Sequence, residues 1–287
     1  GFLQGLADAG IVEGENLTVI YDNAQADTGT ASTIAENYVS QGVDMICGIA
    51  TPSAMAAYNS CMNTDIPVIY TAVSDPVEAG LANEDGTPAG NITGTSDALD
   101  TTAVMKLIMA ANPDVKKIGL LYDKSQDSSK VPVADAISFC EENGIEYIEK
   151  TGTTNAEVSA AADALVAEGV DAVFTPTDNT IMTAELAIFE KFADAKIPHY
   201  TGADSFALNG AFLGYGVNYT ELGTATADMA ADVLVNGADP ATTAVRTLDS
   251  GIVTVNTETA AAVGIDDGVF KDMCEELKEV TTAEEFE

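Results

Sequence analysis

One sequence pattern occurs twice in this chain, and it constrains the fold more than any other feature. Gly42–Met55 reads GVDMICGIATPSAM, and 127 positions later Gly169–Met182 reads GVDAVFTPTDNTIM. In each copy a short apolar run, typical of a buried strand, ends at a polar turn that opens a helix. Pro52 fits the first turn of such a helix, where its missing N–H loses no bond. The pattern predicts two strand–helix units of the same design.

The sequence around the two copies is also similar. Both copies are preceded by a helical run and followed by a further strand that ends in an acidic turn. Two similar halves of this kind predict two lobes whose polar turns face one cleft, although two independent strand–helix units would give the same pattern. The matching segments are Ala35–Gly42 with Ala162–Gly169, Asp65–Val68 with Lys196–His199, and Ser74-Asp75 with Asp204-Ser205.

Strands and helices alternate along the chain. The expected strands include Asn16–Asp22, Met45–Ala50 and Pro67–Val73 in the first half, with helices between them. This alternation predicts the α/β class, with two doubly wound parallel-sheet lobes covered by helices on both faces. We expect residues 1–96 plus 219–245 to form the first lobe and residues 97–218 plus 246–287 to form the second.

Composition excludes several function classes. The 287 residues carry 46 acidic and 11 basic side chains, a net charge of −35, which opposes binding to nucleic acid or to an anionic membrane surface. The single histidine, His199, makes a metal site unexpected, and the four cysteines form no CxxC pair. Phosphate-binding and nucleotide-binding glycine motifs and the G-x-S-x-G motif of hydrolases are absent, so we expect no cofactor and no catalytic set.

Polar side chains follow the expected strands where these end. In a parallel sheet, ligands bind outside the carboxyl ends of the strands. Thr51, Ser53, Thr71, Ser74 and Asp75 fall at that edge. A helix beginning at Thr51 also presents unpaired N–H groups that suit a carboxylate or phosphate. An ordinary strand-to-helix turn without a ligand is the alternative interpretation.

Five segments together resemble one protein family. IATPSA (49–54), YTAVSDP (70–76), GNITGTSD (90–97), DKSQDSS (123–129) and PTDNT (176–180) resemble the ABC-transporter substrate-binding proteins of the type I periplasmic fold. The nearest branch is the one associated with tryptophan and other aromatic amino acids. The resemblance covers essentially the whole chain.

The resemblance implies a function and a location. Two lobes joined by three crossings would close over a small, amino acid-like solute and deliver it to a membrane permease. Such a protein would be a monomer outside the cytoplasm, often lipid-anchored, and not an enzyme. The effector-binding half of a transcription regulator, or a sensor of the same fold, is the alternative, but no DNA-binding helix-turn-helix segment is found.

If the ligand is an amino acid, its two charges need partners, because an unpaired buried charge is costly. The carboxylate would suit the helix start at Thr51, with Ser53 and then Thr71 or Ser74. The ammonium would suit Asp178, whose alternative role is a helix cap, or Asp204. The remaining expected ligand residues are Asn179 in the turn after Asp178, Asp75, and the weaker candidates Asp97 and Ser128 at the rim.

The beginning of the sequence departs from the family pattern. Gly1–Ala9 already reads as a helix, and neither an export signal nor a first strand precedes it. The resemblance implies a strand between Asn16–Asp22 and Met45–Ala50. We therefore expect the first lobe to lack its N-terminal strand.

Overall fold

The chain divides into two compact units in a computed structural model that describes residues 1–283. Unit 1 consists of Gly1–Ala98 and Asn218–Asp249, and unit 2 consists of Leu99–Val217 and Ser250 onward. The chain crosses between the units three times. Both units combine parallel strands with covering helices, so the α/β class predicted from the strand–helix alternation is confirmed.

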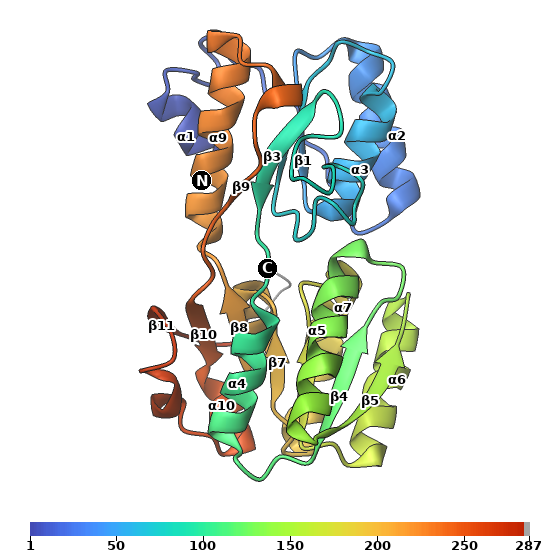
Figure 1. Ribbon diagram of the computed structural model, residues 1–287, viewed down its shortest axis with the longest axis vertical. Coiled ribbons are helices and arrows are strands. Elements are labelled where there is room, and N and C mark those ends of the chain that lie inside the picture. Colours follow the sequence, from blue (N-terminus) through green and yellow to red (C-terminus); the bar gives the residue numbers. More distant parts are fainter. Residues whose placement is uncertain (284–287) are drawn as a thin grey trace. The chain divides into compact units, whose positions relative to one another are not determined.

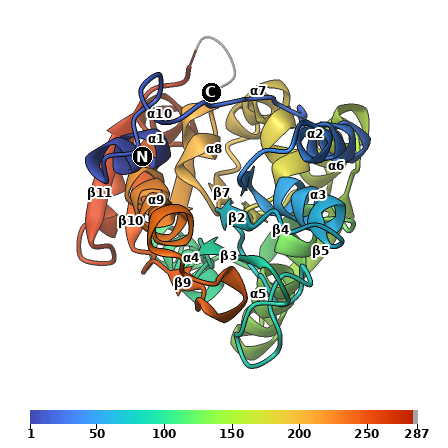
Figure 2. The same ribbon diagram turned by 90° about the horizontal axis from the view of Figure 1, so that it is seen from above.

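Unit 1 is built on a four-stranded parallel sheet with the order β1-β2-β3-β9. Its alternate residues face two helical layers. Ile46, Val68 and Tyr70 pack towards α2 and α3, whereas Ile69 and Cys47 pack towards α1 and α9. Figure 1 and Figure 2 show α2 beside α3 and α1 beside α9. Its elements are α1 (Phe2–Asp8), α2 (Thr28–Gln41), β1 (Ile46–Ile49), α3 (Thr51–Cys61), β2 (Val68–Thr71), β3 (Ile92–Ser96), α9 (Tyr219–Asn236), η1 (Pro240–Thr242) and β9 (Arg246–Thr247).

Unit 2 is built on a seven-stranded sheet with the order β11-β10-β8-β7-β6-β4-β5. All neighbouring strands are parallel except β8 and β10, which run antiparallel. Its elements are α4 (Thr101–Ala111), β4 (Lys117–Tyr122), α5 (Asp127–Asn143), β5 (Glu146–Thr151), α6 (Asn155–Glu168), β6 (Ala172–Thr175), α7 (Asn179–Asp194), β7 (His199–Thr201), α8 (Asp204–Leu208), β8 (Leu213–Gly216), β10 (Ile252–Asn256), α10 (Thr257–Val263), η2 (Asp267–Phe270) and β11 (Glu276–Val280).

Close packing fixes β1 against α3. Gly48 lies where a Cβ atom would approach the backbone of Ala54 to 2.6 Å, so only glycine allows the helix to pack this near the strand. The same turn therefore sets the distance between the sheet and the first residues of α3.

The strand expected at Asn16–Asp22 is wrong. These residues form only an isolated bridge between Glu13 and Leu17, and Ile20 and Tyr21 are exposed. A strand exists only where a neighbour completes its hydrogen-bond ladder, and no strand within residues 1–283 pairs with this segment. In the described chain β1 lies at the edge of its sheet and does not pair with residues 16–22.

Candidate functional site

The first turn of α3 lies at the carboxyl edge of unit 1 and has no side-chain cap. Its N-cap residue is Ala50, whose methyl side chain cannot accept a hydrogen bond from the first helical N–H groups. Thr51 is only 3% exposed, yet its hydroxyl bonds to no residue within 1–283. The Thr51 hydroxyl oxygen is not fully buried, so it keeps contact with solvent. The helix start thus presents unused donors and one unused hydroxyl.

Two alanines at this edge have unfavourable backbone conformations. Ala50 has φ 66° and ψ 160°, a region populated almost only by glycine, and Ala72 has φ 57°. Each alanine follows the last residue of a strand, β1 and β2 respectively. Such strain costs about 1–3 kcal/mol per residue and collects at sites with a function. The two turns that carry the predicted ligand residues are therefore the strained ones.

A buried carboxylate lies at the end of β3. Asp97 accepts a hydrogen bond from Ser74 Oγ at 3.1 Å and another from the Tyr219 hydroxyl at 2.8 Å. Burial raises the pKa of the Asp97 carboxyl, and the two hydrogen bonds oppose that shift. No lysine or arginine of the described chain forms an ion pair with it. Two of its about four lone-pair positions remain without a donor.

The other residues predicted in unit 1 divide into two groups. Thr71, the last residue of β2, is buried, and its hydroxyl lies 3.2 Å from the Thr95 hydroxyl. Ser53 is half-buried on the first turn of α3. Asp75 instead closes its own turn, because its Oδ1 accepts the N–H groups of Val77 and Glu78 at 3.0 and 2.9 Å. The Asp75 carboxylate therefore stabilises the turn at Pro76.

In unit 2, Asp178 has a different environment. It is 1% exposed and caps α7, since its Oδ1 accepts the N–H groups of Thr180 and Ile181, both at 3.0 Å. Its Oδ2 accepts the Asp123 N–H at 2.8 Å and the Ser129 hydroxyl at 2.6 Å. Four donors fill the lone-pair positions of a carboxylate. Burial nevertheless raises the pKa of the Asp178 carboxyl to about 6, against the lowering effect of these bonds.

Asp178 therefore joins two strand–helix turns of unit 2. Asp123, which follows β4, also accepts the Thr180 hydroxyl at 2.7 Å through its own carboxylate. Asn179 donates to the Gln126 side chain at 3.2 Å, which adds a fourth bond between the same two turns. Ser128, the second residue of α5, is buried, and its hydroxyl has no partner within residues 1–283.

Asp204 is the first residue of α8 and lies three positions after the end of β7. Burial raises the pKa of its carboxyl, while the N–H of Ser205 and the charge of Lys278 oppose the shift. Unlike Asp178, it does not cap its helix, because the N-cap residue is Ala203.

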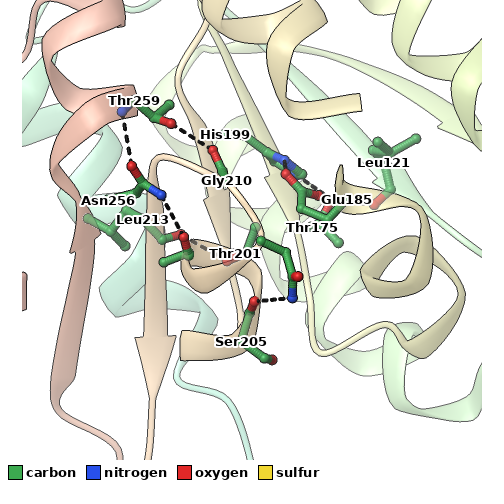
Figure 3. A network of polar contacts seen from close by, with 12 residues as sticks. Leu121, Thr175, Glu185, His199, Thr201, Ser205, Gly210, Leu213, Asn256 and Thr259 are labelled. Atoms are coloured by element: carbon green, nitrogen blue, oxygen red, sulfur yellow. Dashed lines mark hydrogen bonds and ion pairs between the residues drawn. The ribbon is translucent and has the colours of Figure 1, made fainter. Parts of the chain in front are cut away.

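A polar network in the interior of unit 2 fixes β6 and β7. His199 Nε2 lies 2.8 Å from the Thr175 hydroxyl, which donates to the Leu121 carbonyl at 2.9 Å. Since that hydroxyl uses its proton on the carbonyl, His199 Nε2 must donate to it. His199 Nδ1 faces Glu185 of α7 at 3.0 Å, as Figure 3 shows. The network ties α7 to the two strands that end at Asp178 and Asp204.

Sequence reasoning missed Tyr219, Asp123 and Ser129 as partners of the predicted residues. Asp123 and Ser129 lie inside the DKSQDSS segment, so their position after a strand was a usable signal. The hydroxyl of Tyr219 reaches Asp97 across 122 positions, and no local pattern indicates that contact. Three aromatic side chains of unit 2, Tyr122, Phe206 and Tyr215, are buried.

The described residues contain no group of three histidine, cysteine or acidic side chains placed to hold a metal ion. Within the same residues all four cysteines are free thiols. Among residues 1–283, none of the helices combines the length and apolar character that a membrane crossing requires.

The sequence matches the profile of a known family, described as ABC transporter substrate binding protein, over residues 1–271. A tyrosine-binding protein of Clostridioides difficile (strain R20291) is 36% identical over 263 residues, which cover 92% of this chain and 75% of that protein.

Solved structures of other proteins are also similar to this chain in fold and sequence. The fold superimposes with a TM-score of 0.87 on an ABC domain from Streptococcus pneumoniae in complex with L-Trp, at 30% identity over 96% of this chain and 92% of that one. A conserved domain protein from Vibrio cholerae O1 biovar El Tor has the same TM-score at 31% identity, over 96% and 93% of the two chains.

Proposed function

Because the chain belongs to the ABC transporter substrate-binding proteins, we propose that it is the solute-binding component of an importer. In this proposal it works outside the cytoplasm as a monomer, periplasmic or lipid-anchored at the cell surface, and delivers its ligand to a membrane permease. It binds the ligand reversibly and catalyses no reaction.

The proposed ligand is an amino acid with an aromatic side chain. The observation that carries this assignment is the agreement of two relatives, a tyrosine-binding protein at 36% identity and a structure with L-Trp at 30% identity. The residues at the strand ends support it, because they offer donors for a carboxylate and acidic groups for an ammonium. A zwitterion carries no net charge, so the −35 charge of the chain does not repel it.

We propose that the first lobe is unit 1 (Gly1–Ala98 plus Asn218–Asp249), that the second lobe is unit 2 (Leu99–Val217 plus Ser250 onward), and that the ligand binds at the carboxyl ends of their strands. Thr51, Ser53, Thr71, Ser74 and Asp97 form the part that the first lobe contributes. The second lobe contributes Ser128, Asn179 and Asp204. Asp178 and Asp75 act indirectly, since their bonds to neighbouring donors hold the turns that carry the other residues.

Binding of L-tryptophan tests this proposal directly. The chain contains no tryptophan, so the fluorescence of the ligand can be followed without a protein tryptophan signal. We expect saturable one-to-one binding of L-tryptophan, L-tyrosine or L-phenylalanine, checked by calorimetry, with glucose and inositol as unbound controls. The ligand should be recovered unchanged after prolonged incubation. No heat and no change in melting temperature with any of the common amino acids would refute the function.

A further inference from the structure

Asp97 stands out among the acidic residues at the strand ends. It is 4% exposed, carries two hydroxyl donors, and has no cationic partner in the described chain. A buried carboxylate in this condition either binds a proton or requires a cation, since an isolated buried charge is costly. Asp178 does not present this need, because four donors already surround its oxygens.

Hydrogen-bond donors lie on the same sheet edge as the acceptor Asp97. Its strand, β3, neighbours β2, which neighbours β1, and β1 leads into the first turn of α3. That turn combines uncapped N–H groups with the unpartnered hydroxyl of Thr51, a side chain more than nine-tenths buried. An acceptor site at the end of β3 and a donor site at the end of β1 thus lie on one sheet edge of one unit.

The spacing suits one ligand head group. Neighbouring strands lie about 4.8 Å apart, which places the ends of β1 and β3 about 10 Å from each other. The nitrogen and the carboxyl oxygens of an α-amino acid lie about 3 Å apart. A hydrogen bond of about 2.8 Å on each side of the head group extends it to nearly the full separation.

From this arrangement we propose that unit 1 alone recognises both charges of an α-amino acid, with Asp97 accepting the ammonium and the first turn of α3 binding the carboxylate. The assignment rests on the proposed function and names the residue that makes a free α-amino group a requirement. Ser74 and Tyr219 are positioning residues, since their hydroxyls hold the Asp97 oxygens. The raised pKa of the Asp97 carboxyl agrees with a charge that lacks a cation until the ligand supplies one.

Asp97→Asn tests the assignment with little disturbance of the fold. The Asn oxygen can still accept from the Tyr219 hydroxyl, and the Ser74 hydroxyl can turn to accept from the Asn amide. Three probes separate the contributions of the two charges: L-tryptophan, indole-3-propionate without the ammonium, and tryptamine without the carboxylate. Their fluorescence and calorimetric titrations are compared for the unaltered chain and the variant.

We expect the unaltered chain to bind L-tryptophan about 10- to 100-fold more tightly than indole-3-propionate, the range for a charge-assisted hydrogen bond. In Asp97→Asn this preference should nearly vanish, with weaker binding of L-tryptophan and unchanged binding of indole-3-propionate. The matched control is Asp100→Asn at the exposed cap of α4, which should keep the preference, and Asp204→Asn tests the competing acceptor. If Asp97→Asn keeps the full preference for L-tryptophan over indole-3-propionate, the assignment is overturned. If Asp204→Asn loses this preference instead, Asp204 is the acceptor of the ammonium.

Tyr219→Phe provides a second variant that keeps the carboxylate. It removes one donor from Asp97 Oδ2, so we expect a several-fold loss for L-tryptophan and no change for indole-3-propionate. Equal losses for both probes contradict a role at the ammonium. If the unaltered chain binds no amino acid at all, the proposed function fails together with this inference. If it binds L-tryptophan while the Asp97 variants keep their preference, only the inference fails.

Discussion

The carboxyl edge of unit 1 and the carboxyl edge of unit 2 differ in how completely their polar groups are satisfied. In unit 1, α3 has no side-chain cap, Ala50 and Ala72 have strained backbones, and Asp97 has two donors. In unit 2, Asp178 has four donors and joins two turns. No non-glycine residue at the strand ends of unit 2 within the described chain has a positive φ.

This difference separates two kinds of buried carboxylate that look alike in the sequence. Burial raises the pKa of both Asp97 and Asp178, so the shift alone does not distinguish them. The number and the type of hydrogen-bond donors distinguish the two carboxylates. Backbone N–H groups cannot reverse their polarity, whereas hydroxyls can donate or accept, so Asp178 belongs to the framework and Asp97 can adapt to a ligand.

The largest expected effect is on the framework of unit 2. Asp178→Ala removes the cap of α7 and leaves the Asp123 N–H without an acceptor, so we expect a loss of about 3–5 kcal/mol in the free energy of unfolding. Urea unfolding measures it. The matched control is Asp100→Ala at the cap of α4, with an expected cost of about 1 kcal/mol, because among residues 1–283 its carboxylate accepts only the Ala103 N–H. Equal losses would remove the distinction between the two caps.

The second expected effect is on pH dependence. The pKa of Asp178 is about 6 in the folded chain and an ordinary aspartate has a pKa of about 3.9, so the folded state holds a proton that the unfolded state has released between these values. Stability from this group is therefore present at low pH and is lost as pH rises from about 4 to about 6, by up to about 3 kcal/mol. Asp178→Asn should lack this component. Parallel stability curves for the two proteins would contradict the expectation.

A smaller effect, of opposite sign, is expected at the strained turn of unit 1. Ala50→Gly relieves a backbone conformation that costs about 1–3 kcal/mol, and the flexibility of glycine offsets about 0.5–1 kcal/mol of the gain. We expect a net stabilisation of about 1 kcal/mol in thermal or urea unfolding. Ala57→Gly, inside α3, should destabilise by about 1 kcal/mol or more. If both changes destabilise equally, the strain at Ala50 has no energetic weight.

The smallest effect on stability is expected at Asp97. Asp97→Asn should change the free energy of unfolding by no more than about 0.5 kcal/mol, because both neighbouring hydroxyls can satisfy the amide. Measuring it beside Asp178→Asn completes the comparison, since the second variant turns an amide donor towards the fixed N–H of Asp123. A loss above about 2 kcal/mol at Asp97 would show that it too belongs to the framework.

Local sequence patterns predicted the features of the fold that depend on residues close together in the sequence. The strand-to-helix turns at Thr51 and Asp178 follow from an apolar run before each, the proline of the first and the aspartate cap of the second, and both occur where expected. The strand at Asn16–Asp22 was wrong because pairing depends on a neighbour far away in the sequence. For the same reason the contact between Tyr219 and Asp97 could not be predicted, and the different donor sets of Asp97 and Asp178 became visible only with the fold.

The histidine network inside unit 2 has a practical consequence. His199 is the only histidine in the chain, so its imidazole gives one set of ring signals in a nitrogen-15 NMR spectrum. Nε2 donates to Thr175 and Nδ1 faces Glu185, so these signals report directly on the contact of α7 with β6 and β7. In nitrogen-15-labelled protein, a ligand titration followed at this ring would show whether events at the strand ends reach the interior of the unit, with no added probe.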